Sequence, residues 1–107
     1  MSNPSSAYPV VPVEGKATRQ VLVQNEQLMI VEFNFEEGGV GALHSHPHVQ
    51  STFVKSGRFE FTCDGETRIL SAGDALLIPS GAVHGCRPLD GPGTLVDSFT
   101  PRRDDFL

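Results

Sequence analysis

The sequence predicts an all-β protein, built as a small sandwich or barrel of antiparallel strands. Short segments alternate between apolar and polar residues, and this period of two is typical of half-buried strands. Turn-forming residues recur about every eight to twelve positions, as they do between the short strands of such folds. No segment of about ten residues keeps the helical period of about 3.6. These three observations favour a β-sandwich or β-barrel over a helical fold.

The 107 residues are enough for one domain with a modest core. Residues 1–18 carry three prolines and several serines without a clear period, so we expect an N-terminal arm there. Such an arm could dock on a partner by adding a strand to its sheet. Residues 19–107 are then the single folded domain.

Alternation and turn residues predict the elements of this domain in order. The pair Asp64-Gly65 has the residue types of a two-residue hairpin turn, so the strands on either side of it should pair. In chain order, the expected elements are a hairpin over 19–39 that turns near Asn25 and Glu26, a hairpin joining 58–63 to 66–70, a short buried strand over 75–78, a Pro/Gly-rich loop over 85–93 and a last strand over 94–99.

The formal net charge of −5 argues against nucleic acid and anionic membranes as partners, because no basic surplus is available. The chain starts without a basic segment followed by an apolar run, and no stretch approaches about 20 apolar residues. We therefore expect a cytoplasmic protein. Two cysteines are too few for a disulfide scaffold. Cys63 fits the core, and Cys86 fits a small apolar filler that could approach a metal.

Histidines gather in two short β-type segments about 40 residues apart. His44, His46, His48 and Gln50 occupy every second position, so in an extended strand they would share one face. His84 lies in the second segment. Imidazole and amide donors of this kind suit a first-row divalent metal inside a barrel. Because Pro47 perturbs the strand, we expect His48 to turn away or to support the ligands from behind.

Two spaced patterns resemble the two motifs of the cupin superfamily. The first runs through Gly38, His44, His46, Gln50 and Gly57, and the second through Gly73, Pro79, Gly81 and His84. The resemblance implies a jelly-roll β-barrel of two packed antiparallel sheets with an interior metal. The implied ligands are His44, His46, Gln50 and His84. Two residues differ from the common pattern, since the family often has Glu where this chain has Gln50 and Asn where it has Pro88.

The exchange at position 50 has an electrostatic consequence. Three neutral imidazoles and a carboxamide leave the full charge of +2 on a divalent ion, whereas a glutamate would reduce it to +1. Such a centre is a stronger Lewis acid and favours anionic or chelating oxygen ligands. It is less suited to cycling iron to a higher oxidation state. The identity of the metal stays open among Ni, Zn, Mn, Fe and Co.

The last predicted strand places a carboxylate among apolar residues. Leu95, Asp97 and Phe99 share one face, so Asp97 points inward if its two neighbours do. A buried carboxylate is costly unless it is paired, hydrogen-bonded or used in chemistry. Arg103 is one candidate partner.

Three segments resemble a narrower group, the pectin-degradation cupins of the KdgF type. They are HSHPHVQ, SGRFEFTCDGETRILSAGD and DSFTPRRDDFL, and the resemblance covers most of residues 28–107. It implies linearisation of 4,5-unsaturated monouronates, from pectin or alginate, to 5-keto-4-deoxyuronate. It also implies a homodimer, catalytic roles for Asp97 and Arg103, and contacts of Phe99 and Arg103 with an anionic sugar substrate.

Other interpretations stay open at this point. The fold also hosts non-haem iron dioxygenases and cupins that bind sugars without turnover. Asp97 could cap a loop at the barrel edge, and Phe99 could belong to the core alone. Arg103 could pair with Asp104 or Asp105.

Overall fold

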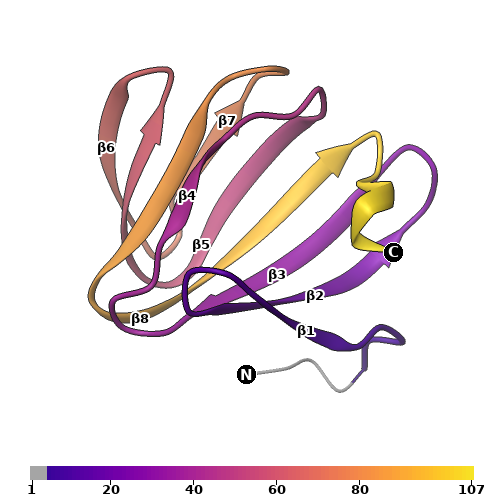
Figure 1. Ribbon diagram of the computed structural model, residues 1–107, viewed down its shortest axis with the longest axis horizontal. Helices are drawn as coiled ribbons and strands as arrows, with labels where there is room; N and C mark the ends of the chain where they lie inside the picture. Colours follow the sequence, from indigo (N-terminus) through magenta and orange to yellow (C-terminus); the bar gives the residue numbers. More distant parts are fainter. Residues whose placement is uncertain (1–4) are drawn as a thin grey trace.

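In the computed structural model, residues 5–107 are described, and they form eight strands and one short 3-10 helix (Figure 1). In chain order these are β1 (Val10–Val13), β2 (Ala17–Gln24), β3 (Met29–Phe35), β4 (Gly41–His44), β5 (Val49–Cys63), β6 (Glu66–Ser71), β7 (Ala75–Ile78), β8 (His84–Thr100) and η1 (Asp104–Phe106). The all-β prediction is therefore confirmed. No helix in this part of the chain has the length and apolar content needed to cross a membrane.

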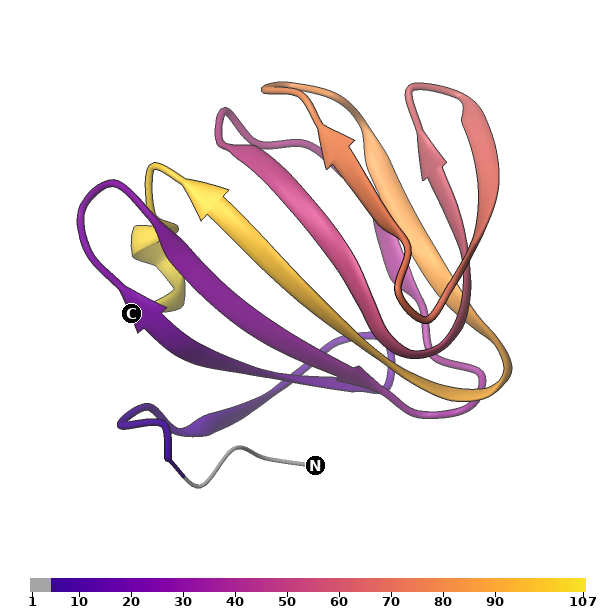
Figure 2. The ribbon, with the colours of Figure 1, turned by 180° about the vertical axis from the view of Figure 1, so that it is seen from behind.

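The strands pair antiparallel in the order β1-β2-β3-β8-β5-β6, with β4 added to β8 and β7 added to β5. The long strands β5 and β8 pair along their lengths, from Val49 opposite Thr100 to Cys63 opposite His84. Both strands curve, so that the two ends of each belong to different walls of the barrel (Figures 1 and 2). β8 therefore begins with His84 in one wall of the barrel and ends in the other wall.

Gly57 lies where β5 bends. The register between β5 and β8 shifts on both sides of Ser56, which marks a bulge that increases the local twist. Gly57 has a φ of +81°, and a Cβ there would lie 2.8 Å from the carbonyl oxygen of Pro92. Only glycine tolerates both the positive φ and this close approach of two backbones.

The prediction of a loop over residues 85–93 is wrong, because this segment belongs to β8. Residues 85–89 pair with β5, from Thr62 opposite Gly85 to Arg58 opposite Leu89. The turn-forming residues mark the bend of the strand instead, where Asp90 has a φ of +60° and Gly91 a φ of +134°. Pro and Gly signal bends within long curved strands as well as loops.

Other predicted elements agree with the structure, with two differences. The hairpin over 19–39 corresponds to β2 and β3, and Asp64-Gly65 forms the turn between β5 and β6. Residues 75–78 are β7, but only Ile78 is buried there, while Leu77 is 66% exposed on the outer face. Part of the predicted arm is a strand, since β1 pairs with β2 of its own chain and Val13 packs against the core.

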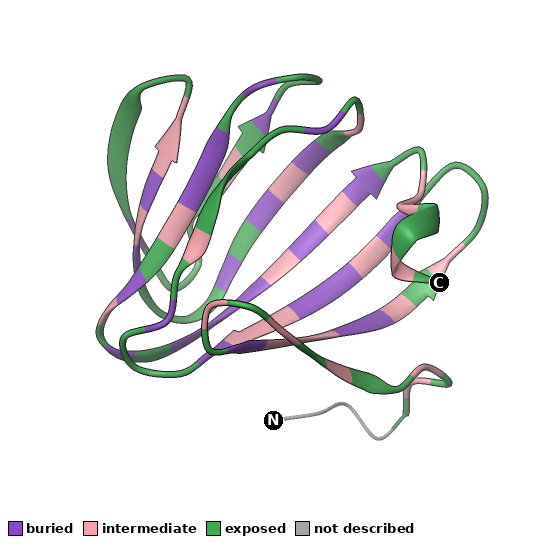
Figure 3. Cartoon of the chain, in the orientation of Figure 1, coloured by how far each residue is buried: buried purple, intermediate pink, exposed green. Residues whose placement is uncertain are grey.

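The core lies between the two walls of the barrel, on the inner faces of the strands. Burial alternates along parts of β3, β5 and β8, where purple segments follow green or pink ones (Figure 3). On β5, Gln50, Thr52 and Val54 are buried, while Phe53 between them is exposed. The buried apolar residues form two clusters. These are Ala17, Phe35, Val54, Phe59, Phe61, Leu70, Ile78, Ala82 and Leu95 in one, and Val21, Met29, Val31 and Phe99 in the other.

Candidate metal centre and substrate cavity

Three histidines from two chain segments meet at one end of the barrel. His44 ends β4, His46 lies in the turn before β5, and His84 begins β8, where it is the register partner of His44. One ligand nitrogen from each lies within 4.8 Å of the others. His46 and His84 are buried, whereas His44 is exposed. These three residues could hold a metal ion.

Hydrogen bonds to the backbone fix the tautomer of each ring. The Nδ1 atoms of His44 and His84 lie 2.8 Å and 2.9 Å from the carbonyl oxygens of Ala42 and Ala82, and His46 Nδ1 lies 3.1 Å from that of His48. Since a carbonyl oxygen only accepts, each Nδ1 carries the proton and each Nε2 presents its lone pair. Burial lowers the pKa of His46 and of His84. Both rings are therefore neutral at pH 7, as metal ligands must be.

Gln50 turns its amide oxygen toward the histidines. Its Nε2 donates hydrogen bonds to Thr52 Oγ1, at 2.9 Å, and to Asp97 Oδ2, at 3.1 Å. Its Oε1 lies 2.9 Å from His46 Nε2. With the proton on His46 Nδ1, two lone pairs face each other at this distance, and that is unfavourable unless a cation or a second proton lies between them.

The donors present fit a divalent first-row metal. Three imidazole nitrogens and one amide oxygen are ligands that such ions accept. His84 Nε2 is buried and has no hydrogen-bond partner among the described residues, which is costly for a polar atom without a ligand. His44, His46, Gln50 and His84 would hold the ion.

The four period-two residues do not lie on one continuous strand, which corrects the simplest interpretation of their spacing. The chain leaves β4 at His44, bends around Pro47, and enters β5 at Val49. The bend still brings His46 and Gln50 together. His48 is not part of the three-histidine cluster, and its ring centre lies 5.4 Å from that of His46.

Asp97 points inward between Leu95 and Phe99, as the alternation predicts. Burial raises the pKa of this carboxyl to about 7, although a hydrogen bond with Thr52 and the charge of Arg103 act in the opposite direction. Its Oδ1 is buried without a hydrogen-bond partner in the described part of the chain. The group can therefore exchange a proton near neutral pH.

A cavity of about 330 Å³ connects these residues. His44, His84, Asp97, Arg103 and Phe106 are among the residues that line it. A slightly larger hollow of about 360 Å³ lies elsewhere, beside Ala17 and Pro92, but it contains none of the histidines. Chemistry, not volume, singles out the first cavity as the candidate site.

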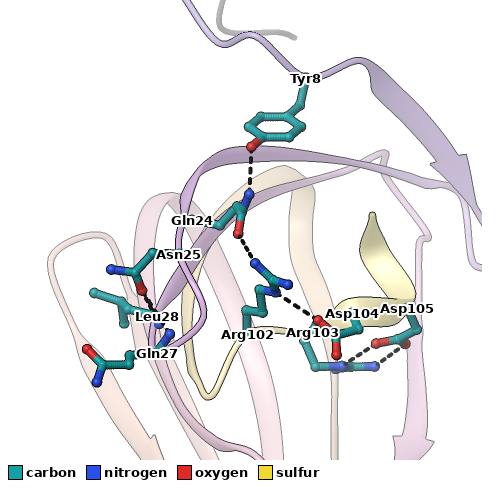
Figure 4. A network of polar contacts seen from close by, with 9 residues as sticks. All are labelled: Tyr8, Gln24, Asn25, Gln27, Leu28, Arg102, Arg103, Asp104 and Asp105. Atoms are coloured by element: carbon teal, nitrogen blue, oxygen red, sulfur yellow. Dashed lines mark hydrogen bonds and ion pairs between the residues drawn. The ribbon is translucent and has the colours of Figure 1, made fainter.

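Arg103 lies over Phe99 at the edge of this cavity, with its Cζ 5.2 Å from the ring centre. Its guanidinium also forms a bidentate ion pair with Asp105, so one of the open alternatives for this residue is realised (Figure 4). Phe99 is fully buried in the core and its ring centre lies 5.6 Å from that of His46. Phe99 is thus a core residue that also packs against His46 and Arg103 of the candidate site.

Cys86 also lines the cavity but is not part of the three-histidine cluster. Burial raises the pKa of its thiol to about 12, so in the metal-free chain the thiol stays protonated at neutral pH. Its side chain packs against the core, as expected for a small apolar filler.

Two residues of the site were missed by sequence reasoning. Thr52 accepts a hydrogen bond from Gln50, and it follows Gln50 by two positions on the inner face of β5, which is a signal that the sequence contains. Phe106 lines the cavity from η1. Its position in a polar C-terminal tail gives no such signal.

An all-β barrel whose interior histidines come from two separate segments defines the cupin class of protein. The family model described as Cupin domain matches residues 31–98, which is more than half of the chain. The chain therefore belongs to the cupin family.

Within this family, the chain is similar to proteins of the KdgF type. It is 38% identical to the pectin degradation protein KdgF of Dickeya dadantii (strain 3937) over 90 residues, which are 83% of this chain and 82% of that protein. The structure of KdgF from a Halomonas species matches with a TM-score of 0.88 at 38% identity, covering 92% of this chain and 91% of that one. An RmlC-like cupin from Shewanella frigidimarina matches with a TM-score of 0.89 at 34% identity, covering 99% and 97%.

Proposed function

We propose that the protein is an enzyme that opens the ring of 4,5-unsaturated monouronates and yields 5-keto-4-deoxyuronate in the breakdown of pectin or alginate. The similarity to pectin degradation proteins supports this substrate class. The observation that carries the proposal is the position of Asp97, a buried carboxyl that lines the same cavity as His44, His84 and Arg103.

A divalent transition metal on His44, His46, Gln50 and His84 is part of the proposal. When bound, it supplies a positive charge that polarises a sugar oxygen and orients the ring. The amide of Gln50 leaves that charge unreduced. The three rings, each held at Nδ1 by a backbone carbonyl, present their Nε2 atoms without reorganisation.

Asp97 is the proton carrier in this mechanism. As a carboxylate, it takes the proton of the anomeric hydroxyl while the bond between C1 and the ring oxygen breaks, which leaves an aldehyde at C1 and an enolate over C4 and C5. It then returns the proton to C4, which gives the ketone at C5. The sequence is an isomerisation that moves one proton and consumes neither water nor an oxidant. The raised pKa of Asp97, about 7, suits a group that must accept and donate in turn.

Arg103 holds the substrate, and Phe99 supports Arg103 from below. The guanidinium receives the sugar carboxylate through paired hydrogen bonds, which are among the stronger interactions for this geometry. Phe99 supplies an apolar surface beneath Arg103. The cavity is large enough for one monosaccharide, which agrees with a monouronate substrate.

The test is to mix the purified protein with unsaturated galacturonate and follow the absorbance of the C4–C5 double bond. We expect the absorbance to fall, to stop falling after chelation, and to resume when a divalent metal is restored. An oxygen electrode in the same reaction should record no consumption. Oxygen uptake would indicate a dioxygenase instead, and binding without turnover would indicate a sugar-binding cupin.

Two further expectations belong to this proposal. We expect a cytoplasmic protein, as suits a small enzyme acting on released monosaccharides. We also expect a homodimer, and light scattering of the purified protein would give its mass directly.

A further inference from the structure

Arg103 is held on several sides by the C-terminal segment. The Asp105 carboxylate accepts hydrogen bonds from its Nε, at 3.0 Å, and from its Nη2, at 2.9 Å. The ring centre of Phe106 lies 4.3 Å from its Cζ, and that of Phe99 lies 5.2 Å away. Only 13% of the Arg103 side chain is exposed. The guanidinium therefore has one orientation before any ligand enters.

The turn that carries Asp105 is itself anchored. The ring of Phe106 contacts a second guanidinium group, since the Cζ of Arg19 is 4.2 Å from its centre. Phe106 also packs edge to face against Phe33, with ring centres 6.1 Å apart. These contacts attach η1 to the inner faces of β2 and β3. Asp105 is thereby held at a constant place relative to the cavity.

The pair with Asp105 uses only one of the two bidentate edges of the guanidinium. Arginine has five N–H groups in one plane, and either the Nε/Nη2 edge or the Nη1/Nη2 edge can match a carboxylate. Asp105 occupies the first edge. Nη1 has no hydrogen-bond partner among the described residues, while Arg103 lines the cavity that also contains Asp97 and His84.

We propose that Asp105 is a positioning residue, which holds Arg103 by its Nε/Nη2 edge so that the Nη1/Nη2 edge receives the carboxylate of a sugar acid. The choice of a sugar acid rests on the proposed function. Asp105 itself does not touch the substrate. Its effect is to keep a long, flexible side chain in the orientation that binding requires, which reduces the entropy lost on binding.

The opposite role for Asp105 makes an opposite prediction. If Asp105 merely occupied the place of the substrate carboxylate, its removal would free Arg103 and tighten the binding of anions. Loss of one negative charge near the cavity would act in the same direction. Only a positioning role predicts that anion binding weakens when this acidic residue is neutralised.

Asp104 provides a matched control on the same turn. Its carboxylate pairs with Arg102, at 2.8 Å, and its side chain is 82% exposed (Figure 4). Asp104→Asn and Asp105→Asn remove the same charge from adjacent positions. Any difference between the two variants is therefore due to the partner of each carboxylate and not to the net charge.

The experiment is calorimetric titration of the full chain with galacturonate, and with its neutral methyl ester as the reference sugar. We expect Asp105→Asn to raise the Kd for galacturonate about tenfold. Arg103 would no longer keep the orientation in which it makes its charge-assisted contact with the sugar carboxylate. Asp104→Asn should stay within about twofold of the parent chain, and the ester should bind all three proteins equally. Asp105→Glu keeps a carboxylate and should recover most of the affinity, which a role in folding alone would not produce.

The proposal is overturned if Asp105→Asn binds galacturonate as tightly as the parent chain or more tightly, if both neutralised variants weaken equally, or if the parent chain binds no galacturonate. Thermal unfolding of each variant, measured alongside, ensures that folded proteins are compared. Failure of the proposed function looks different. The parent chain would then bind galacturonate but leave the double bond of the unsaturated uronate intact.

Discussion

Replacing Asp97 with asparagine removes an ionisable group from the barrel interior while keeping its shape. The amide oxygen that Asp97→Asn introduces can still accept the hydrogen bond from Gln50 that Asp97 Oδ2 accepts at 3.1 Å. We expect turnover to be lost with the metal content unchanged, because the proton carrier is gone and the metal ligands are not. We also expect the metal-free protein to become more stable at neutral and alkaline pH.

The magnitude follows from the pKa of the buried carboxyl. Its pKa rises from an ordinary value of 3.8 to about 7 on folding, mainly because burial disfavours the charged form. At about 1.4 kcal/mol per pH unit, this corresponds to an upper limit of about 4 kcal/mol. As the pH rises from 4 to 7, the unfolded chain loses this proton first, so the free energy of unfolding falls across that window. Above pH 7 the free energy of unfolding has fallen by its full amount.

The assay is urea unfolding of chelator-treated protein at several pH values. The stability of Asp97→Asn relative to the parent chain should grow by about 2 to 4 kcal/mol between pH 4 and pH 8. Asp90→Asn is the control, because Asp90 lies on the same strand but is 73% exposed and pairs with Arg58. A difference that stays constant with pH would show that Asp97 is not a destabilised buried carboxylate. Retained turnover would remove Asp97 from the mechanism.

Three other predictions test the site from different sides. Gln50→Glu should bind the metal more tightly but turn over at least about tenfold more slowly, because a carboxylate reduces the charge of the centre and lies against Asp97; equal or faster turnover, with metal content measured alongside, would contradict this. His84→Ala should lose most of its metal, measured by elemental analysis against a His48→Ala control, since His48 is not part of the cluster; full metal content would contradict the assigned ligands. Cys86 should react only slowly with iodoacetamide at pH 8 in the folded protein and readily after unfolding, because its side chain is half-buried and burial raises the pKa of its thiol to about 12; rapid labelling of native protein, located by mass spectrometry, would contradict the raised pKa.

The features predicted correctly from the sequence are those that depend only on neighbouring residues, such as strand alternation and turn geometry. Alternation alone predicts that Asp97 faces inward with Leu95 and Phe99, because side-chain direction in a strand depends only on the period of two. The Asp64-Gly65 turn is predicted by the need for positive φ at both positions, and the φ angles are +49° and +82°. Local backbone chemistry is sufficient at such positions.

The differences arise where distant segments decide the structure. Residues 85–93 have the composition of a loop, but β5 pairs with residues 85–89, β4 pairs with Cys86, and β3 pairs with Gly93 just beyond the bend. The convergence of His44, His46 and Gln50 depends on a turn at Pro47 that the simple strand spacing does not predict. Asp105 and Phe106 lie in a polar tail, and only its packing against Arg19 and Phe33 places Phe106 at the cavity and Asp105 behind Arg103.

β8 carries a histidine of the cluster at one end and Asp97, the proposed proton carrier, further along, without a loop between them. His84 and Asp97 are 13 positions apart, an odd number, yet both side chains are buried, because the bend at Asp90 and Gly91 shifts the alternation between them. Beyond the bend the period of two holds, so inserting a single residue before Val96 would turn Asp97 toward solvent and bring Val96 and Ser98 into the barrel. We expect chains that share this chemistry to preserve the spacing of this last part of the strand.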